Sequence, residues 1–390
     1  MSSPATYFAV IVGAGLSGAT LARELADAGK RVLVVDKRAH AGGNVFDEVE
    51  PLSGLRVARY GAHLFHTNDE GVWAYVRRFA RWQRWDHRVV TRVRGRLVPV
   101  PANINTVNAL FEDANVADEA GMRAFMARER EGDERAATNS EEVALARVGR
   151  RLYESLFEAY TQKQWGVSAR ELDPLVLQRI PVRENFDDRY FTDRYQALPV
   201  GGYAAFVDAL LAHENITVRL GTDFFGERAA LERAAEWVLY TGPVDAFFAG
   251  AGLPRLEYRS INFESRVIDC AGFAQPNSVV NYGDASVEFT RSIEYKHFLH
   301  QTSPTGKTVI VSERSTADGE PYYPMPTQVN KDLYARYQAL AAAAEAEARA
   351  PRVRFVGRLA TYKYINMDAA IRGGLDAAAE ILRTASGGGC

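Results

Sequence analysis

Three glycines, Gly13, Gly15 and Gly18, follow an apolar segment and precede a helical pattern, and this spacing is typical of a turn that binds phosphates. The apolar segment runs from Tyr7 to Val12 and the helical pattern from Ala19 to Ala28. Gly13 permits the turn, Gly15 lets the backbone approach a pyrophosphate, and Gly18 lets the helix pack closely on the strand. The phosphates would then meet the helix N-terminus. The alternative is a tight βαβ turn without a ligand.

The residues that follow favour FAD over NAD as the dinucleotide. A second apolar strand, residues 31–35, ends at Asp36, where a carboxylate can accept hydrogen bonds from a ribose. The next loop carries another glycine pair, Gly42 and Gly43. A second pair of exposed backbone amides suits a longer cofactor, so we expect FAD.

A strand and a helix near the other end of the sequence fit the same site. Residues 353–356 predict a buried strand followed by Gly357 and Arg358, and residues 368–382 predict a helix that starts near Asn366 or Asp368. Such a helix can point a second N-terminus at the cofactor. A plain βα unit that caps the fold is the alternative.

The segments between the first glycine turn and the C-terminal strand and helix have the pattern of inserted domains. Two β-rich runs, 89–93 and 96–100, surround a glycine turn and predict a hairpin. Helical spacing continues from Asn103 to about Glu171. Residues 287–298 and 307–312 predict strands of an antiparallel sheet, and residues 335–350 predict an alanine-rich helix.

Several polar clusters permit more than one interpretation. His63 and His66, three residues apart, could hold a metal, be two ordinary histidines, or lie on a loop that faces a flavin. Trp165 next to Gly166 forms either a stacking wall for a sugar or base, or the buried end of a helix. Arg291 on a strand either binds a phosphate or forms a surface salt bridge.

A stretch of arginines and tryptophans over residues 73–88 is superficially a nucleic-acid surface. We expect an amphipathic helix with a solvated face instead, because 47 Lys and Arg against 49 Asp and Glu give a formal net charge of -2. This balance also argues against an anionic membrane as partner, and no run approaches the ~18 apolar residues of a membrane span.

The length of 390 residues suggests two or three domains. Cysteine occurs only at Cys270 and Cys390, which suits a reducing cytosol and predicts a cytoplasmic protein.

Seven motifs beyond the first glycine turn resemble the bacterial UDP-galactopyranose mutase family. They are Gly42-Gly43-Asn44, Gly61 to Thr67, Tyr160 to Gly166, Leu198 to Tyr203, Arg291 to Phe298, Pro321 to Pro324, and Gly357 to Asp368. Amine oxidases and desaturases share the glycine turn, whereas the motifs from Tyr160 onward are more specific.

The resemblance implies an α/β fold with three parts. A Rossmann-like FAD-binding domain would comprise residues 1–68, 200–246 and 351–385. An inserted helical domain, residues 102–170, would carry a mobile loop with Lys163-Gln164-Trp165. An antiparallel β-sheet domain would comprise residues 84–101, 171–199 and 247–334.

The implied activity is an isomerase that interconverts UDP-galactopyranose and UDP-galactofuranose, with no net redox change, through an adduct between the sugar and N5 of reduced FAD. NAD(P)H or a reductase would supply the electrons, and a homo-oligomer such as a dimer would serve cell-wall galactofuranose synthesis. A FAD-dependent amine oxidase or desaturase is the first alternative, and a non-catalytic nucleotide-sugar-binding protein is the second.

The family's functional residues can be carried over where positions match. The catalytic residues would be Arg179 and Arg291, which hold the diphosphate, and His63, which lies beside the flavin; no metal is implied. The substrate residues would be Tyr160, Thr161, Trp165, Tyr190, Asn281, Tyr323 and Tyr364. The cofactor residues would be Gly13, Gly15, Ser17, Gly18, Asp36, Lys37, Gly43, Asn44, His63, Arg358, Asn366 and Met367.

Two positions depart from the family pattern. Asn366 stands where many members have Asp, and Leu156 where an aromatic residue often meets the uracil.

Overall fold

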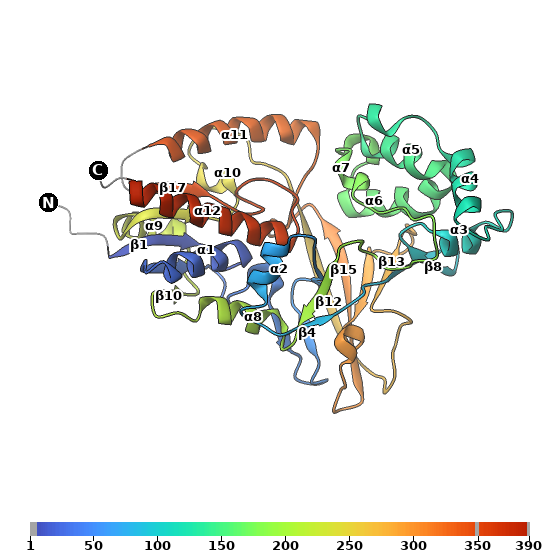
Figure 1. Ribbon diagram of the computed structural model, residues 1–390, viewed down its shortest axis with the longest axis horizontal. Helices are drawn as coiled ribbons and strands as arrows, with labels where there is room; N and C mark the ends of the chain where they lie inside the picture. Colours follow the sequence, from blue (N-terminus) through green and yellow to red (C-terminus); the bar gives the residue numbers. More distant parts are fainter. Residues whose placement is uncertain (1–5, 348–350, 388–390) are drawn as a thin grey trace.

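The computed structural model describes residues 6–347 and 351–387, and these form two groups of helices joined by β-structure (Figure 1). The group that contains the first and the last described segments of the chain surrounds a five-stranded parallel sheet. Its strands, in spatial order, are β10 (Ile216–Arg219), β2 (Val32–Val35), β1 (Tyr7–Val12), β11 (Ala235–Tyr240) and β17 (Arg352–Phe355).

Helices cover both faces of this sheet because its strands are apolar on both sides. Ala9 and Ile11 face α1 (Leu16–Asp27), α8 (Gly202–Leu211) and α12 (Met367–Gly387). Val10 faces the opposite side, where α9 (Phe224–Arg233), α10 (Val244–Phe247) and α11 (Gln328–Ala346) pack. The predicted α/β class with a Rossmann-like unit is confirmed.

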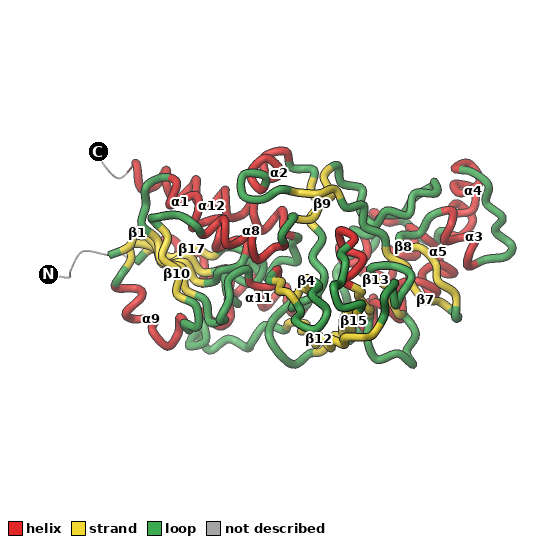
Figure 2. Tube along the Cα trace, turned by 90° about the horizontal axis from the view of Figure 1, so that it is seen from below, coloured by secondary structure: helices red, strands yellow, loops and turns green. Residues whose placement is uncertain are grey.

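A seven-stranded sheet connects the two helical groups, and Figure 2 shows its strands between them. In spatial order the strands are β16 (Tyr323–Pro324), β12 (Tyr258–Asp269), β15 (Lys307–Thr316), β14 (Arg291–Glu294), β13 (Val279–Tyr282), β7 (Val89–Val93) and β8 (Arg96–Val100). The predicted hairpin is β7 with β8. The sheet is antiparallel except for β13 and β7, which run parallel.

Two predictions of local structure were wrong. The strand expected over 287–298 ends at Glu294, and residues 295–300 form a 3-10 helix that places Leu299 and His300 at positive φ. The amphipathic helix expected over 73–88 ends at Val76, because the chain turns there and continues as a strand. These elements are α2 (Glu70–Val76) and β6 (Trp82–Arg84).

The second helical group realises the helical spacing predicted from residue 103. It contains α3 (Ile104–Leu110), α4 (Glu119–Glu129), α5 (Ser140–Leu152), a π-helical turn (Tyr153–Phe157), α6 (Glu158–Trp165) and α7 (Leu175–Gln178). Asn103, Asp118 and Asn139 start three of these helices, each accepting a hydrogen bond from a backbone N–H in the first turn. Gly149 kinks α5 at φ 77°, where a Cβ would lie 2.0 Å from the Glu129 carbonyl oxygen.

Two small sheets complete the fold. One pairs β3 (Asp47–Val49) with β4 (Arg56–Ala58), and the other places β9 (Tyr195–Pro199) between β5 (Phe65–Thr67) and β6. The alanine-rich helix predicted over 335–350 begins earlier, at Gln328, and ends at Ala346. Residues 348–350 of that prediction, and residues 1–5 of the predicted FAD-binding domain, lie outside the described residues.

Candidate functional site

The turn between β1 and α1 is shaped by glycines whose missing side chains are needed. Gly13 has φ 107°, and a Cβ there would lie 2.1 Å from Oγ1 of Thr241. A Cβ on Gly18 would lie 1.9 Å from the carbonyl oxygen of Gly13. Gly15 and Gly43 face each other, since a Cβ on Gly43 would lie 3.0 Å from the Gly15 Cα. These contacts leave a backbone cradle that only glycine can form.

A cavity of about 480 Å³, which we call the glycine cavity, opens beside this turn. Of the predicted cofactor residues, those that line it are Gly13, Gly15, Ser17, Asp36, Lys37, Gly43, Asn44, His63, Arg358, Asn366 and Met367. Gly18 lies beneath the turn and does not line the cavity. The cradle fits a dinucleotide, since backbone and small residues border it where phosphates would lie.

Polar side chains hold the rim of the glycine cavity in place. Asp36, at the end of β2, accepts hydrogen bonds from the backbone N–H groups of Ala14 (2.8 Å) and Arg38 (2.9 Å). Lys37 instead forms an exposed ion pair with Glu320 across the rim, at 2.6 Å. Arg38 lies over the ring of Tyr60 and donates a hydrogen bond to Oδ1 of Asn44. The sequence analysis did not include Arg38 in the site.

The C-terminal elements form the opposite wall of the glycine cavity. Ser17 Oγ donates to the carbonyl of Ala370 in α12 at 3.0 Å. Arg358 donates to the carbonyl of Ile365 at 2.6 Å and lies 5.2 Å from the ring centroid of Tyr323. The predicted terminal strand and helix therefore border the same cavity as the first glycine turn.

A second cavity of about 320 Å³, the arginine cavity, lies between the seven-stranded sheet and the second helical group. Of the predicted catalytic and substrate residues, those that line it are His63, Tyr160, Arg179, Tyr190, Asn281, Arg291, Tyr323 and Tyr364. Leu156, the position that departs from the family pattern, lines it as well.

Arg291 is held at the wall of the arginine cavity by a buried carboxylate. Its Nε donates to Oε2 of Glu313, a side chain that is only 1% exposed on β15. Burial by itself would lower the pKa of Arg291, but Glu313, Tyr160 and Tyr323 raise it well above its usual range. Glu313 is bonded to Nε of Arg291, and neither terminal nitrogen of Arg291 has a hydrogen-bond partner among the described residues. Both terminal nitrogens can therefore bind an anionic ligand.

Arg179 and the tyrosines provide the remaining polar groups. Arg179 lies 3.9 Å from the ring centroid of Tyr364 and donates to its hydroxyl at 2.6 Å. Burial raises the pKa of Tyr160 to about 12 and also raises the pKa values of Tyr190 and Tyr323. These hydroxyls therefore stay protonated at neutral pH and can donate hydrogen bonds.

Two of the predicted substrate residues do not line the arginine cavity. Thr161 is 3% exposed and is not among the residues that line this cavity. Trp165 is 5% exposed, and its ring packs 6.1 Å from that of Tyr323 and 5.9 Å from that of Tyr364. In this arrangement Trp165 supports the two tyrosines from behind, which corresponds to the buried interpretation of this residue and not to a stacking wall.

His63 lies where the cavities meet, since it lines both the glycine cavity and the arginine cavity. Its Nδ1 is 2.8 Å from the carbonyl of Gly61, and its Nε2 is 3.4 Å from the hydroxyl of Tyr322. Burial, aided by Arg358 and Arg291, lowers the pKa of His63 to about 4. The imidazole is therefore neutral at pH 7.

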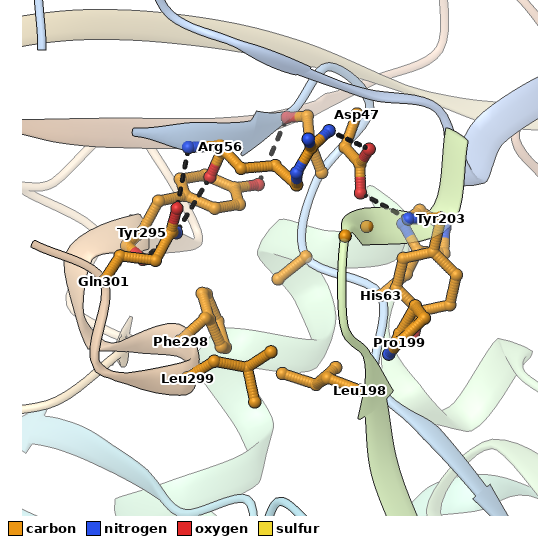
Figure 3. A pocket seen from close by; sticks show the side chains of 14 residues that line it. Asp47, Arg56, His63, Leu198, Pro199, Tyr203, Tyr295, Phe298, Leu299 and Gln301 are labelled. Atoms are coloured by element: carbon orange, nitrogen blue, oxygen red, sulfur yellow. Dashed lines mark hydrogen bonds and ion pairs between the residues drawn. The ribbon is translucent and has the colours of Figure 1, made fainter. Parts of the chain in front are cut away.

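A third, smaller cavity of about 190 Å³ also contacts His63 (Figure 3). Its polar side chains bond one another: Asp47 pairs with Arg56 and accepts from the N–H of Tyr203, and Gln301 bonds both backbone groups of Arg56. Its opposite wall is apolar and comprises Leu198, Pro199, Phe298 and Leu299. The small cavity therefore favours an apolar group.

The sequence analysis missed Asp193 and His87, which line the arginine cavity, and Glu313, which lies behind Arg291. His66 Nδ1 lies 2.9 Å from Oδ2 of Asp193, and His87 is buried nearby with its pKa lowered to about 3 by burial. Glu313 carried a usable signal, because it follows Val309 and Val311 in the inward-facing alternation of β15. A carboxylate in such a row indicates a buried partner.

Within the described residues, no group of three or more His, Cys, Asp or Glu side chains is placed to hold a metal ion. None of the helices in that part of the chain combines the length and the apolar character that a membrane-spanning helix requires.

Comparison with known proteins places this geometry in a family. The family model for UDP-galactopyranose mutase matches residues 155–364, and that for an NAD(P)-binding Rossmann-like domain matches residues 11–79. A probable UDP-galactopyranose mutase from Klebsiella pneumoniae is 39% identical over 96% of this chain and 94% of its own length. This chain belongs to the UDP-galactopyranose mutase family.

A further relative and a solved structure extend the comparison. A dTDP-fucopyranose mutase from Escherichia coli is 33% identical over 95% of this chain and 97% of its own. A crystal structure of a reduced UDP-galactopyranose mutase superposes with a TM-score of 0.75 at 17% identity, covering 97% of this chain and 96% of that one. The latter likeness concerns the fold alone.

Proposed function

We propose that this protein is a flavin-dependent isomerase that interconverts UDP-galactopyranose and UDP-galactofuranose with FAD bound in the glycine cavity. The observation that carries the proposal is the junction at His63, where a backbone cradle that fits a dinucleotide meets a cavity whose lining includes Arg179 and Arg291. A nucleotide sugar in the arginine cavity would present its diphosphate to those arginines and its sugar to the cofactor.

Reduced FAD, when bound, supplies a nucleophilic nitrogen, N5, for attack on the anomeric carbon of the sugar. Arg291 and Arg179 stabilise the negative charge that develops on the departing diphosphate, because both are fixed before the reaction starts. The same phosphates accept hydrogen bonds from the hydroxyl groups of Tyr190, Tyr323 and Tyr364. Tyr160 and Asn281 bind the uridine, with Thr161 buried beside Tyr160 on α6, and Trp165 packs behind Tyr323 and Tyr364.

His63 serves as a neutral positioning group at the junction, and its low pKa fits that role. The cofactor contacts come from Gly13, Gly15, Ser17, Asp36, Gly43, Asn44, Arg358, Asn366 and Met367, with Gly18 shaping the turn and Lys37 closing the rim.

Some finer features belong to the same proposal. We divide the chain into a FAD-binding domain (1–68, 200–246, 351–385), a helical domain (102–170) and a sheet domain (84–101, 171–199, 247–334). The Lys163-Gln164-Trp165 segment expected on a mobile substrate loop lies on α6 instead, and α7, within 171–199, packs with the helices. The protein would act in the cytoplasm as a homo-oligomer such as a dimer, take electrons from NAD(P)H or a reductase, and feed galactofuranose into cell-wall polymers.

The test is to incubate the purified yellow protein with UDP-galactofuranose, with and without dithionite, and to separate the products by chromatography. UDP-galactopyranose formed only after reduction would support both the activity and its need for reduced flavin. No product in either state, with bound FAD verified by release and spectroscopy, would reject the mutase. Because one relative is named a dTDP-fucopyranose mutase, a dTDP-fucose pair is the competing substrate in the same assay. Stoichiometric oxidation of an amine would instead indicate an oxidase.

A further inference from the structure

The loop between β13 and β14 wraps around the ammonium group of one lysine on α6. Nζ of Lys163 donates to the backbone carbonyls of Tyr282 (2.7 Å), Asp284 (2.7 Å), Val287 (2.8 Å) and Phe289 (3.2 Å). Four carbonyl oxygens thus share the three N–H donors of one charge. Partial burial of the ammonium group lowers the pKa of Lys163. The hydrogen bonds of this oxygen cage offset the free-energy cost of that burial.

The cage joins three segments that line the arginine cavity. Asn281 precedes the loop on β13 and Arg291 follows it on β14, and both line the cavity. Tyr160 lies one helical turn before Lys163 on α6. Gly283 lies against that turn, since a Cβ there would be 3.9 Å from the backbone nitrogen of Tyr160. Lys163 itself does not line the cavity.

We propose that Lys163 is a positioning residue that fixes α6, which carries Tyr160, relative to the two strands that carry Asn281 and Arg291. Asn281 and Arg291 are paired on the adjacent strands β13 and β14, so the sheet sets their separation. By binding the β13–β14 loop to α6, Lys163 sets the position of Tyr160 relative to both of them. This inference rests on the proposed function, because it concerns the binding of a uridine diphosphate in that cavity.

The chain offers a matched control with the same chemistry elsewhere. Nζ of Lys296, a side chain that is 6% exposed, donates to the backbone carbonyls of Cys270 (2.8 Å), Ala271 (3.0 Å) and Gly272 (2.8 Å). Lys296 does not line the arginine cavity. Loss of either cage should lower the melting temperature, but only loss of the Lys163 cage should change ligand binding.

The experiment titrates UDP into the FAD-loaded protein, its Lys163→Ala variant and its Lys296→Ala variant by calorimetry. For Lys163→Ala we expect UDP affinity to fall by about tenfold or more, with the FAD content unchanged, because charged hydrogen bonds that order the site are lost. Lys296→Ala should bind UDP like the parent protein. If Lys163→Ala fails to fold, Lys163→Met keeps the apolar stem and carries the same expectation.

Chemical rescue separates positioning from general stability. Propylammonium corresponds to the atoms that Lys163→Ala removes, and it should restore UDP affinity, whereas 1-propanol, which lacks the charge, should not. Unchanged UDP affinity in Lys163→Ala, or an equal loss in Lys296→Ala, would overturn the inference. If the parent protein does not bind UDP, the proposed function fails first, and the inference about Lys163 fails with it.

Discussion

The glycine cavity and the arginine cavity meet at His63, but backbone forms most of the binding surface of the first and side chains form that of the second. The first is a backbone cradle, in which Gly13, Gly15 and Gly43 matter for the atoms they lack. The second is made of long side chains, in which Arg291 depends on Glu313 behind it. A backbone site is specified by short stretches of sequence, whereas a side-chain site is specified by pairs that only the fold brings together.

The difference predicts that changes in one cavity should leave the other intact. Arg291→Ala should lose about 100-fold or more in turnover, because it removes a preorganised positive charge and leaves Glu313 without its partner. The flavin absorbance per protein should stay normal. Steady-state kinetics with UDP-galactofuranose and dithionite check this. Arg266→Ala is the control, since that arginine is 62% exposed and its one ion pair within residues 6–347 and 351–387 is with Glu264 on the surface of β12. Near-normal turnover in Arg291→Ala would contradict the division of roles.

One buried histidine of the arginine cavity, His87, should make the free energy of unfolding depend on pH. Burial lowers the pKa of His87 to about 3, whereas a histidine in the unfolded chain titrates near 6.5. The contribution of neutral His87 to the free energy of unfolding is fully present above pH 6.5. It is lost as the pH falls, because the unfolded chain binds the proton first, and the loss is about 3 kcal/mol between pH 7 and 4.

Denaturant unfolding at several pH values, compared with the His87→Phe variant, measures this contribution. The variant should show a flatter loss of stability over the same range, whatever its stability at pH 7. Parallel pH profiles for the two proteins would mean that His87 titrates normally in the fold.

In the backbone cradle, the largest effect should come from an added methyl group. Gly18→Ala would place a Cβ 1.9 Å from the Gly13 carbonyl oxygen, so we expect about 1–3 kcal/mol of destabilisation and reduced FAD content. The flavin-to-protein absorbance ratio and the melting temperature report both. Gly373→Ala, on α12 with open space around it, is the matched control. If Gly18→Ala binds FAD fully, the close approach of helix and strand is not needed.

The smallest effect should come from the rim of the glycine cavity. The pair of Lys37 and Glu320 is exposed, with 56% and 64% of the two side chains accessible. Lys37→Met should therefore change the FAD dissociation constant by less than about fivefold, since exposed pairs contribute at most about 1 kcal/mol. Titration of the apoprotein with FAD measures it. A loss of more than tenfold would assign Lys37 a direct contact with the cofactor.

The local signals of the sequence predicted the cradle because strand, turn and helix are contiguous there. Residues 7–28 contain β1, the glycine turn and α1 almost as expected. The helical spacing after residue 103 and the hairpin of β7 and β8 were likewise local patterns.

The arginine cavity was only partly accessible to the same reasoning. The residues suggested a role for Arg291 but left a surface salt bridge equally open, and its actual partner, Glu313, lies on a separate strand. The strand expected through Tyr295 stops at Glu294, because the chain coils into a 3-10 helix that buries Tyr295 against the Ala58 carbonyl. The family resemblance supplied Arg179 and the tyrosines, which local patterns did not.

The hydrogen bond from Ser17 to Ala370 spans 353 residues of sequence. On a ribosome, α1 emerges long before α12 is translated, so the nascent protein carries half of its cofactor cradle for most of its synthesis. The parallel sheet is equally delayed, since β1 must wait for β11 and β17. Contacts this distant slow folding. We therefore expect cofactor binding to follow the synthesis of α12, so a chain that lacks α12 should bind no flavin and be colourless.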